Sequence, residues 1–397
     1  MRNTQFNRRT FLSSSAAGIV AAAVSRGEAG AAVPPQMPMA RFPEKTDLIL
    51  LTDRAPQLET PLHYFRQDLT PNDAFYVRWH LSVIPTTVDL RTFRLTVGGH
   101  VDKPLSLSLN DLRTQFEPVE TIAVNQCSGN GRSLFEPQIP GGQWQQGAMG
   151  NARWKGVRLK DLLDRAGVRA GAVDVSLNGL DSPPLPTVND FVKSLDIDHA
   201  RDGETLVAYE MNGKELPMLN GFPVRLVVPG WYATYWVKAL NEIKVLPEKF
   251  DGYWMTKAYK IPNNATGIET PDALATDLIP INRFAVHSIF VRPEPGEVIR
   301  AGGRYAMEGL AMDSGVGIRR VEVSDDAGKS WKDAKLDAEL GKYSWRRWRF
   351  DWTAGERGSH RFLVRATNAA GDLQLEKHWN HSGYMRMTIE HVDVTVA

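Results

Sequence analysis

The hydrophobic pattern of this 397-residue chain changes character near Asn282. Beyond that residue helix signals vanish, and apolar and polar side chains alternate with a period of two, as in residues 321–324. Turn-forming segments such as 325–328 separate the alternating runs. Short runs with this period are typical of half-buried strands. Residues 281–397 are therefore predicted to form an immunoglobulin-like β-sandwich of about seven strands.

The preceding region mixes strand-like and helix-like segments. Residues 92–97 alternate as a strand does, whereas residues 160–166 place their leucines on one helical face and stop at a glycine. The pattern indicates an α+β chain, with a mixed α/β domain over 73–280 in front of the sandwich. A Pro-rich arm over 33–72 is expected to run along the surface.

Residues 1–32 have the layout of an export signal. The paired arginines Arg8 and Arg9 precede a weakly apolar run, and the small residues at 29–32 offer a cleavage site. This order is typical of a twin-arginine signal, and the apolar run falls short of the roughly 20 residues that span a membrane. The twin-arginine route exports folded proteins, usually ones that have acquired a cofactor in the cytoplasm. The mature protein is therefore expected in the periplasm, without a membrane span.

Charge and motif content exclude several classes of function. With 47 basic and 46 acidic residues the net charge is +1, which gives no reason to expect a nucleic acid or a membrane surface as partner. The sequence lacks C-x-x-C-H, so no c-type haem is attached, and it lacks a G-x-G-x-x-G between strand and helix. The nine histidines are scattered, which disfavours zinc.

Cys127 is the single cysteine, and it lies where a strand end meets the glycine-rich segment 127–132. One thiol cannot form an internal disulfide, so the sandwich depends on packing alone. The residues themselves leave four roles open for this thiol. It is a buried inert side chain, an intermolecular bridge, a catalytic nucleophile or a metal ligand.

Distinctive residues recur in a fixed order along the chain. They are Phe75-Tyr76-Val77-Arg78-Trp79-His80, Asn125 to Arg132, Gly147 to Leu159, Asn220 to Arg225 with Val237-Lys238, and Ala258-Tyr259-Lys260. Together these segments resemble the motifs of the sulfite oxidase family of molybdenum enzymes, over nearly all of the mature chain. The resemblance implies the sulfite oxidase fold, a molybdenum–molybdopterin cofactor with Cys127 as the protein's metal ligand, and a homodimer formed through the sandwich. A thiolate is a soft ligand that suits such a metal.

The resemblance also implies which residues form the substrate site. Arg78 and Arg132 match anion-binding arginines, whose guanidinium forks suit an oxyanion. His80 lies two residues from Arg78, so on a strand it faces the same pocket, where it helps bind substrate or tunes the pocket with pH. Tyr259 matches a tyrosine close to the metal's oxygen ligands. Arg386 is a candidate for a third substrate arginine.

A further set of matching positions implies contacts with the cofactor. Arg225 and Lys238 suit its terminal phosphate, and Asp181 suits the N–H donors of the pterin. Asn220 stands where vertebrate members have histidine, and it still allows a hydrogen bond. The implied contacts are Tyr76, Val77, Arg78, Trp79, His80, Cys127, Asp181, Asn220, Arg225, Trp236, Val237 and Lys238.

An exported chain without haem looks most like the catalytic subunits of bacterial sulfite dehydrogenases. The expected reaction is oxidation of sulfite to sulfate by oxygen-atom transfer, with electrons leaving singly to a periplasmic c-type cytochrome. One alternative is a periplasmic molybdopterin reductase that acts on sulfoxides. The other is a periplasmic binding module without enzymatic activity.

Overall fold

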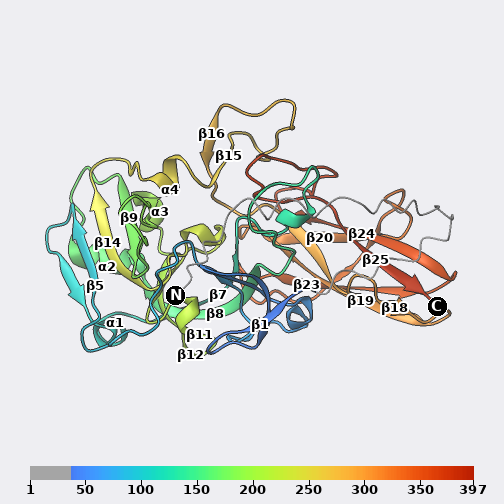
Figure 1. The fold of residues 1–397 in the computed structure, drawn as a ribbon, viewed down its shortest axis with the longest axis horizontal. Helices are drawn as coiled ribbons and strands as arrows, with labels where there is room; N and C mark the ends of the chain where they lie inside the picture. Colours follow the sequence, from blue (N-terminus) through green and yellow to red (C-terminus); the bar gives the residue numbers. More distant parts are fainter. Residues whose placement is uncertain (1–36) are drawn as a thin grey trace, which may run out of the picture. The chain divides into compact units, whose positions relative to one another are not determined.

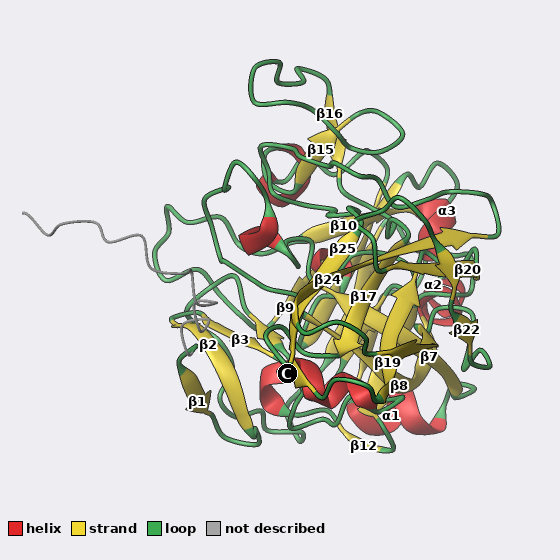
Figure 2. Cartoon of the chain, turned by 90° about the vertical axis from the view of Figure 1, so that its right-hand side faces the viewer, coloured by secondary structure: helices red, strands yellow, loops and turns green. Residues whose placement is uncertain are grey.

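The computed structural model describes residues 37–397, so the predicted signal at 1–32 lies outside the described residues. Most regular structure in the described range is β-strand (Figures 1 and 2). The α-helices are short: α1 (Leu109–Thr114), α2 (Leu159–Ala166), α3 (Ile197–Ala200) and α4 (Tyr253–Thr256). The 3-10 helices are η1 (Leu62–Arg66), η2 (Arg132–Leu134), η3 (Met218–Asn220) and η4 (Ala233–Tyr235). The expected α/β mixture is thus only loosely correct, because most apolar runs are short and bounded by turn residues, which favours strands.

One five-stranded sheet of the first region has the order β10-β9-β14-β5-β6. Its strands are β5 (Leu95–Gly99), β6 (Leu105–Leu107), β9 (Asp174–Gly179), β10 (Lys193–Asp196) and β14 (Leu240–Leu246). β14 and β5 are parallel, and the other neighbours are antiparallel. Helix α2 packs against β5 and buries its leucines. The helix predicted for 160–166 is confirmed, and Gly167 ends it at φ 70°, a left-handed conformation that suits glycine.

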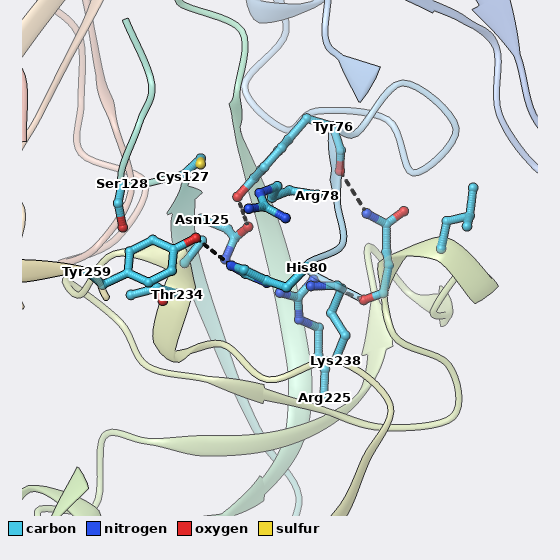
Figure 3. A pocket seen from close by; sticks show the side chains of 13 residues that line it. Tyr76, Arg78, His80, Asn125, Cys127, Ser128, Arg225, Thr234, Lys238 and Tyr259 are labelled. Carbon is cyan, nitrogen blue, oxygen red and sulfur yellow. Dashed lines mark hydrogen bonds between the residues drawn. The ribbon is translucent and has the colours of Figure 1, made fainter. Parts of the chain in front are cut away.

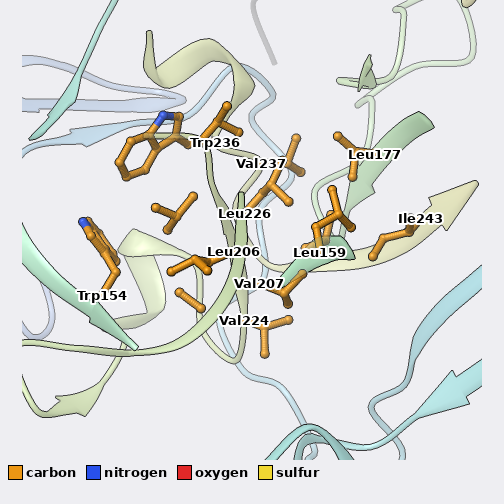
Figure 4. Packing of buried hydrophobic residues seen from close by; sticks show 14 of the residues in the cluster. Trp154, Leu159, Leu177, Leu206, Val207, Val224, Leu226, Trp236, Val237 and Ile243 are labelled. Carbon is orange, nitrogen blue, oxygen red and sulfur yellow. The ribbon is translucent and has the colours of Figure 1, made fainter. Parts of the chain in front are cut away.

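A second sheet carries the single cysteine at the end of one strand. Its order is β12-β11-β8-β7, and β13 pairs with β11. The strands are β7 (Val119–Gln126), β8 (Met149–Arg158), β11 (Leu206–Met211), β12 (Lys214–Glu215) and β13 (Arg225–Val227). The pairing of β7 with β8 runs as far as Gln126 opposite Met149, so Cys127 opens the loop at this edge. Trp154, Leu206 and Trp236 pack in the core beneath the sheet (Figure 4).

The segment that was expected to be a surface arm is folded instead. Strands β1 (Met39–Arg41), β2 (Asp47–Asp53) and β3 (Pro56–Glu59) form an antiparallel sheet with β4 (Val77–Arg78). Leu48 and Leu58 are fully buried against Val77 and Trp79. The prolines end these strands, and the leucines between them supply a buried face that the composition of the segment had obscured.

The C-terminal region consists of two sheets, as the alternation predicted. One has the order β17-β19-β23-β22: β17 (His287–Arg292), β19 (Arg304–Met312), β22 (Lys335–Leu336) and β23 (Arg346–Thr353). The other has the order β18-β25-β24-β20-β21: β18 (Val298–Ile299), β20 (Ile318–Ser324), β21 (Lys332–Asp333), β24 (Gly358–Asn368) and β25 (Glu390–Val396). Val321, Trp348 and Phe362 are buried in the core that both sheets share.

The two regions are joined by a common core and by hydrogen bonds. A further hairpin, β15 (Lys260–Pro262) with β16 (Leu278–Pro280), lies where they meet in the sequence. Phe65 and Tyr259 share a hydrophobic cluster with Trp345 of the C-terminal region. Asn151 Nδ2 also donates to Ser344 Oγ at 2.8 Å. Residues 36–397 therefore form one compact unit. No helix in the described part of the chain is long and apolar enough to cross a membrane.

Candidate active site

The loop after β7 places the cysteine at the wall of a cavity. Cys127 N donates to Ala148 O at 2.9 Å, and Asn130 Oδ1 accepts from Ala148 N at 2.9 Å, so both sides of the loop are fixed to the start of β8. Gly131 turns the chain with φ 79° into η2, which begins with Arg132. Cys127 is buried. Its sulfur is thus held by backbone hydrogen bonds rather than by a mobile loop.

A cavity of about 410 Å³ lies beside this loop (Figure 3). It is lined by Tyr76, Arg78, His80, Asn125, Cys127, Ser128, Leu219, Asn220, Arg225, Ala233, Thr234, Lys238 and Tyr259. These residues come from segments far apart in the sequence. The fold therefore brings together most of the residues that the motifs had singled out.

Alternation along residues 76–80 decides which of them face the cavity. Tyr76, Arg78 and His80 line the cavity. Val77 and Trp79 are buried on the other side of the segment, among the leucines of the sheet formed by β1 to β4. This is the period of two expected of an extended segment. Val77 and Trp79, which were predicted to contact the cofactor, support the wall from behind.

His80 is held as a neutral imidazole between aromatic rings. Its Nε2 shares a hydrogen bond with the Tyr259 hydroxyl, and its ring stacks on Phe191 with centroids 3.6 Å apart. Burial, together with the charge of Arg78, lowers the His80 pKa well below its usual value. Burial likewise raises the pKa of Tyr259, although Arg78 opposes the shift. The pair therefore stays uncharged at neutral pH and holds one proton between two fixed atoms.

The cavity is surrounded by cations that have no carboxylate partner. Within residues 37–397 no acidic side chain lies within ion-pair distance of Arg78, Arg132, Arg225 or Lys238. Burial and the neighbouring Arg225 lower the pKa of Lys238 to about 7, and burial lowers that of Arg225 to about 10. A buried charge is costly unless it is paired. An anionic ligand is the partner that this arrangement lacks.

Unpartnered polar atoms point to the same conclusion. His80 Nδ1, Asn125 Nδ2, Ser128 Oγ, Thr234 Oγ1 and Arg225 Nε are buried without a hydrogen bond, and all five residues line the cavity. Buried polar groups are normally satisfied by protein or water. Donors concentrated in one cavity fit a ligand rich in acceptor oxygens and nitrogens, as a pterin phosphate is.

Arg225 is fixed at the inner end of the cavity. Its guanidinium donates to Asn220 O at 3.0 Å and to Trp236 O at 3.2 Å, and it lies over the Trp154 ring with 5.1 Å to the centroid. Lys238 Nζ lies 4.5 Å from the centroid of Trp79. These contacts orient both cations without neutralising them, as a phosphate site requires.

Three other predicted cofactor contacts lie outside the cavity wall. Trp236 donates its indole N–H to Trp231 O at 2.9 Å, and Val237 is buried in the core beside it. Asp181 is buried, and burial raises its pKa to about 6 although Lys238 opposes the shift. All three surround Lys238 or Arg225 rather than the cavity itself.

The two remaining predicted substrate residues, Arg132 and Arg386, lie in different surroundings. Arg132 lies behind Tyr259 and Tyr384, with its guanidinium carbon 4.9 Å from the Tyr384 ring centroid. Arg386 is not brought to the cavity, because its Nε donates to Glu390 at 2.9 Å and its Nη1 to Leu134 O at 2.9 Å. The guanidinium is already paired in the C-terminal region, so the role of third substrate arginine does not fit it.

Some residues of the site escaped the motifs. Asn125 and Ser128 flank Cys127 in the segment that was singled out, but no role was assigned to them. Lys45 reaches Asn220 Oδ1 from the N-terminal segment and also donates to Asn72 O at 2.8 Å. Tyr384 stacks on Tyr259 with centroids 5.1 Å apart. Lys45 and Tyr384 meet the site only through tertiary contacts, for which local sequence carries no signal.

Comparisons with known proteins agree with this geometry. Residues 80–254 match the family model described as oxidoreductase molybdopterin binding domain, and residues 279–396 match the Mo-co oxidoreductase dimerisation domain. The mitochondrial sulfite oxidase of Homo sapiens is 38% identical over 293 residues, which cover 70% of this chain and 52% of the human protein. The sulfite oxidase of Arabidopsis thaliana is 30% identical over 80% of this chain and 86% of its own length.

A solved structure extends the comparison to the fold. The crystal structure of the sulfane dehydrogenase SoxCD from Paracoccus pantotrophus matches with a TM-score of 0.74 and 25% identity, over 92% of both chains. The chain spans about half the length of the human relative.

Fold and site together define a molybdopterin-dependent oxidoreductase with an appended dimerisation domain. More specifically, the chain belongs to the sulfite oxidase family. Its cofactor is molybdenum–molybdopterin, and the thiol of Cys127, the cations and the unpartnered donors of the cavity fit that group.

Proposed function

We propose that the protein oxidises sulfite to sulfate and passes the two electrons singly to an external acceptor. The observation that carries the proposal is the cavity that combines the single thiol with an excess of unpaired buried cations. Sulfite is a small dianion, so fixed positive charge in a desolvated site is the main help that a protein can give it. Overall, sulfite and water give sulfate, two protons and two electrons.

Each residue has a defined part in this reaction. Cys127 would hold the molybdenum, Arg225 and Lys238 the terminal phosphate, and Asn220 the pterin. When bound, the cofactor supplies oxygen-atom transfer and stores two electrons. Arg78 lines the same cavity as Cys127 and binds the oxyanion. The hydrogen bond between His80 and Tyr259 keeps a proton at a fixed place on the cavity wall.

The acceptor, the compartment and the assembly follow from separate arguments. We assign the role of electron acceptor to a periplasmic c-type cytochrome; the sequence itself carries no haem-attachment motif. The paired arginines near the N-terminus support export by the twin-arginine route. The match of residues 279–396 to a dimerisation domain supports a homodimer.

The alternatives differ in how well they agree with these findings. A binding module without activity conflicts with membership of an oxidoreductase family. Sulfoxide reduction uses a neutral substrate, for which Arg78, the cavity cation not assigned to the cofactor phosphate, has no evident purpose. Sulfane oxidation is the activity for which the structural relative is named, and it is a rival within the same chemistry.

A steady-state assay of the molybdenum-loaded protein tests the proposal. We expect sulfite to reduce both cytochrome c and ferricyanide, and Cys127→Ser to abolish turnover together with bound molybdenum. Parallel assays with a sulfoxide and reduced dye, and with a sulfane substrate, test the rivals. Activity with either rival and none with sulfite would overturn the assignment, as would full activity in Cys127→Ser.

A further inference from the structure

The guanidinium of Arg132 lies in a space that only glycines leave open. A Cβ atom on Gly129 would lie 3.0 Å from its Cζ, one on Gly141 2.8 Å from its Nη1, and one on Gly383 2.8 Å from its Nε. At such distances a side chain at any of these positions would force the guanidinium to shift. The backbone therefore approaches this cation from three sides, which is a common use of glycine.

The guanidinium has incomplete hydrogen bonding in that space. Arg132 is buried and its Nε has no partner. Its Nη2 donates to Ser382 O at 3.2 Å, and its Nη1 only reaches Gly142 O at 3.5 Å. Carbonyl oxygens orient the cation but do not neutralise it, so its charge remains available to the neighbouring cavity.

The segment 380–386, from the C-terminal region, closes the space. Besides Ser382, it supplies Tyr384, whose ring lies against the guanidinium at 4.9 Å. The next residue, Met385, donates its backbone N–H to Ser128 O at 3.1 Å, one residue beyond the cysteine. The loop that carries Cys127 and the segment 380–386 are thereby joined directly.

The ring of Tyr384 also reaches the cavity wall. It stacks on Tyr259 with an interplanar angle of 9° and 5.1 Å between centroids. Tyr259 in turn shares its hydroxyl hydrogen with His80. A continuous stack therefore runs from Arg132 through Tyr384 to Tyr259.

Asn380 holds the segment rigid. This fully buried amide donates to Gly267 O at 3.0 Å and to Tyr384 O at 3.0 Å, and it accepts from Tyr384 N at 3.2 Å. The position of the Tyr384 ring is thus determined by the fold and not by the ligand.

We propose that Tyr384 is a positioning residue for oxyanion binding, which holds Arg132 and Tyr259 in a fixed stack beside the cavity. The inference rests on the proposed function and deepens it, because it assigns part of the anion selectivity to the C-terminal region. The guanidinium of Arg132 lies against the face of the ring, and the Tyr384 hydroxyl also lies within hydrogen-bonding reach of Arg132. A desolvated cation–π contact of this kind corresponds to a change in affinity of about tenfold.

The test compares two replacements of Tyr384 in the molybdenum-loaded protein. We expect Tyr384→Leu to raise KM for sulfite and weaken sulfate binding, measured by isothermal titration calorimetry, by about tenfold while kcat changes little. Tyr384→Phe keeps the ring and loses only the hydroxyl contact with Arg132, so it should restore most of both values. Equal losses in the two variants, or unchanged sulfate affinity in Tyr384→Leu, would overturn the proposal.

Tyr305 provides a matched control for loss of packing. It is a tyrosine with Arg292 at 4.9 Å over its ring, but it lies in the C-terminal region and does not line the cavity. Tyr305→Leu should lower Tm without changing KM or sulfate affinity. If it changed them as Tyr384→Leu does, the effect would be general destabilisation and the proposal would be wrong.

A second variant keeps the test open should Tyr384→Leu fail to fold. Gly383→Ala adds a methyl group beside Arg132 Nε and leaves the tyrosine in place, so it should also weaken sulfate binding. Gly302→Ala imposes a comparable left-handed strain, φ 75° against 61°, where no atom lies within 4 Å, and is its control. Unchanged sulfate affinity in Gly383→Ala would count against the proposal.

The sulfate measurement separates this inference from the proposed function. If the wild-type protein bound sulfate but did not oxidise sulfite, the proposed function would fail while the role of Tyr384 in anion binding stood. If sulfite were oxidised but Tyr384→Leu bound sulfate normally, only the inference would fail.

Discussion

Buried cations have opposite surroundings in the two regions of the chain. In the C-terminal region the buried Arg386 is paired with Glu390 at 2.9 Å, and the half-buried Arg365 with the buried Glu322 at 2.9 Å. Around the cavity of the first region Arg225 is held by two carbonyls and Lys238 lies over the Trp79 ring, and neither cation has a carboxylate within ion-pair distance in the described residues, although Asp181 lies near Lys238. The free-energy cost of burying a positive charge is offset by a carboxylate in the C-terminal region and is not offset around the cavity.

The difference separates structural from functional charge. A paired buried charge satisfies itself and requires nothing from outside, whereas an unpaired one is stable only when a ligand completes it. Removing a cation should therefore have opposite consequences in the two regions. In the first it should abolish ligand binding and spare the fold, and in the second it should weaken the fold and spare the ligand.

The largest effect is expected at Arg225. Arg225→Met should reduce bound molybdenum, measured by elemental analysis, by more than about a hundredfold, because truncating a buried charge contact costs about 3 kcal/mol or more. The thermal stability of the cofactor-free protein should not fall. Arg365→Met is the matched control from the other region, and it should lower stability with molybdenum unchanged. Normal molybdenum content in Arg225→Met would remove the distinction between the regions.

The next effect concerns the paired region. Glu390→Gln leaves Arg386 buried without its counter-charge, so the free energy of unfolding should drop by about 3 kcal/mol in a urea titration. Asp393→Asn breaks the exposed pair with Arg361 and should cost less than about 1 kcal/mol. Similar losses in both variants would show that burial of the pair does not matter here.

Lowering the pH should remove the stabilisation by the Glu390–Arg386 pair gradually, as Glu390 becomes protonated. Burial alone would raise the pKa of Glu390, but Arg386 and His287 outweigh it and bring the value to about 2. Because the pKa is lowered on folding, the stabilisation is complete above pH 4.5 and is lost as the pH falls toward 2. The stability advantage of wild type over Glu390→Gln should shrink by about 2 kcal/mol between pH 5 and pH 3. A constant advantage would contradict the assignment.

The smallest effect comes from an unpaired lysine and has the opposite sign. Burial lowers the pKa of Lys45 to about 7. The unfolded chain then binds a proton that the folded chain lacks, so stability rises with pH from 7 toward the unfolded value. Cofactor-free wild type should gain about 1 kcal/mol relative to Lys45→Met between pH 7 and pH 8. Parallel curves for the two proteins would show that Lys45 is not desolvated.

The local sequence pattern was sufficient to predict those elements whose conformation depends on residues nearby in the chain. The period of two placed Arg78 and His80 on one side, and the leucines before Gly167 marked helix α2. The glycines after Cys127 indicated a loop at a strand end. Each of these features depends on residues only a few positions away in the chain, so it can be predicted from the sequence.

Contacts between distant segments were not accessible in this way. Arg386 was considered for the substrate site because its charge was visible, but its pairing with Glu390, which also binds His287, depends on how the sheets pack. The leucines of residues 47–58 were hidden in a Pro-rich composition, so a folded sheet was mistaken for an arm. Lys45 and Tyr384 were missed for the same reason.

The cavity draws on residues close to both ends of the described chain. Lys45 supports Asn220 on one side, and Tyr384 closes the opposite side through Tyr259. A ribosome-bound chain that has not yet released the segment 380–386 cannot form this enclosure. Cofactor insertion must then follow synthesis of the segment 380–386, and a version of the protein that stops before Asn380 should be recovered from cells without molybdenum.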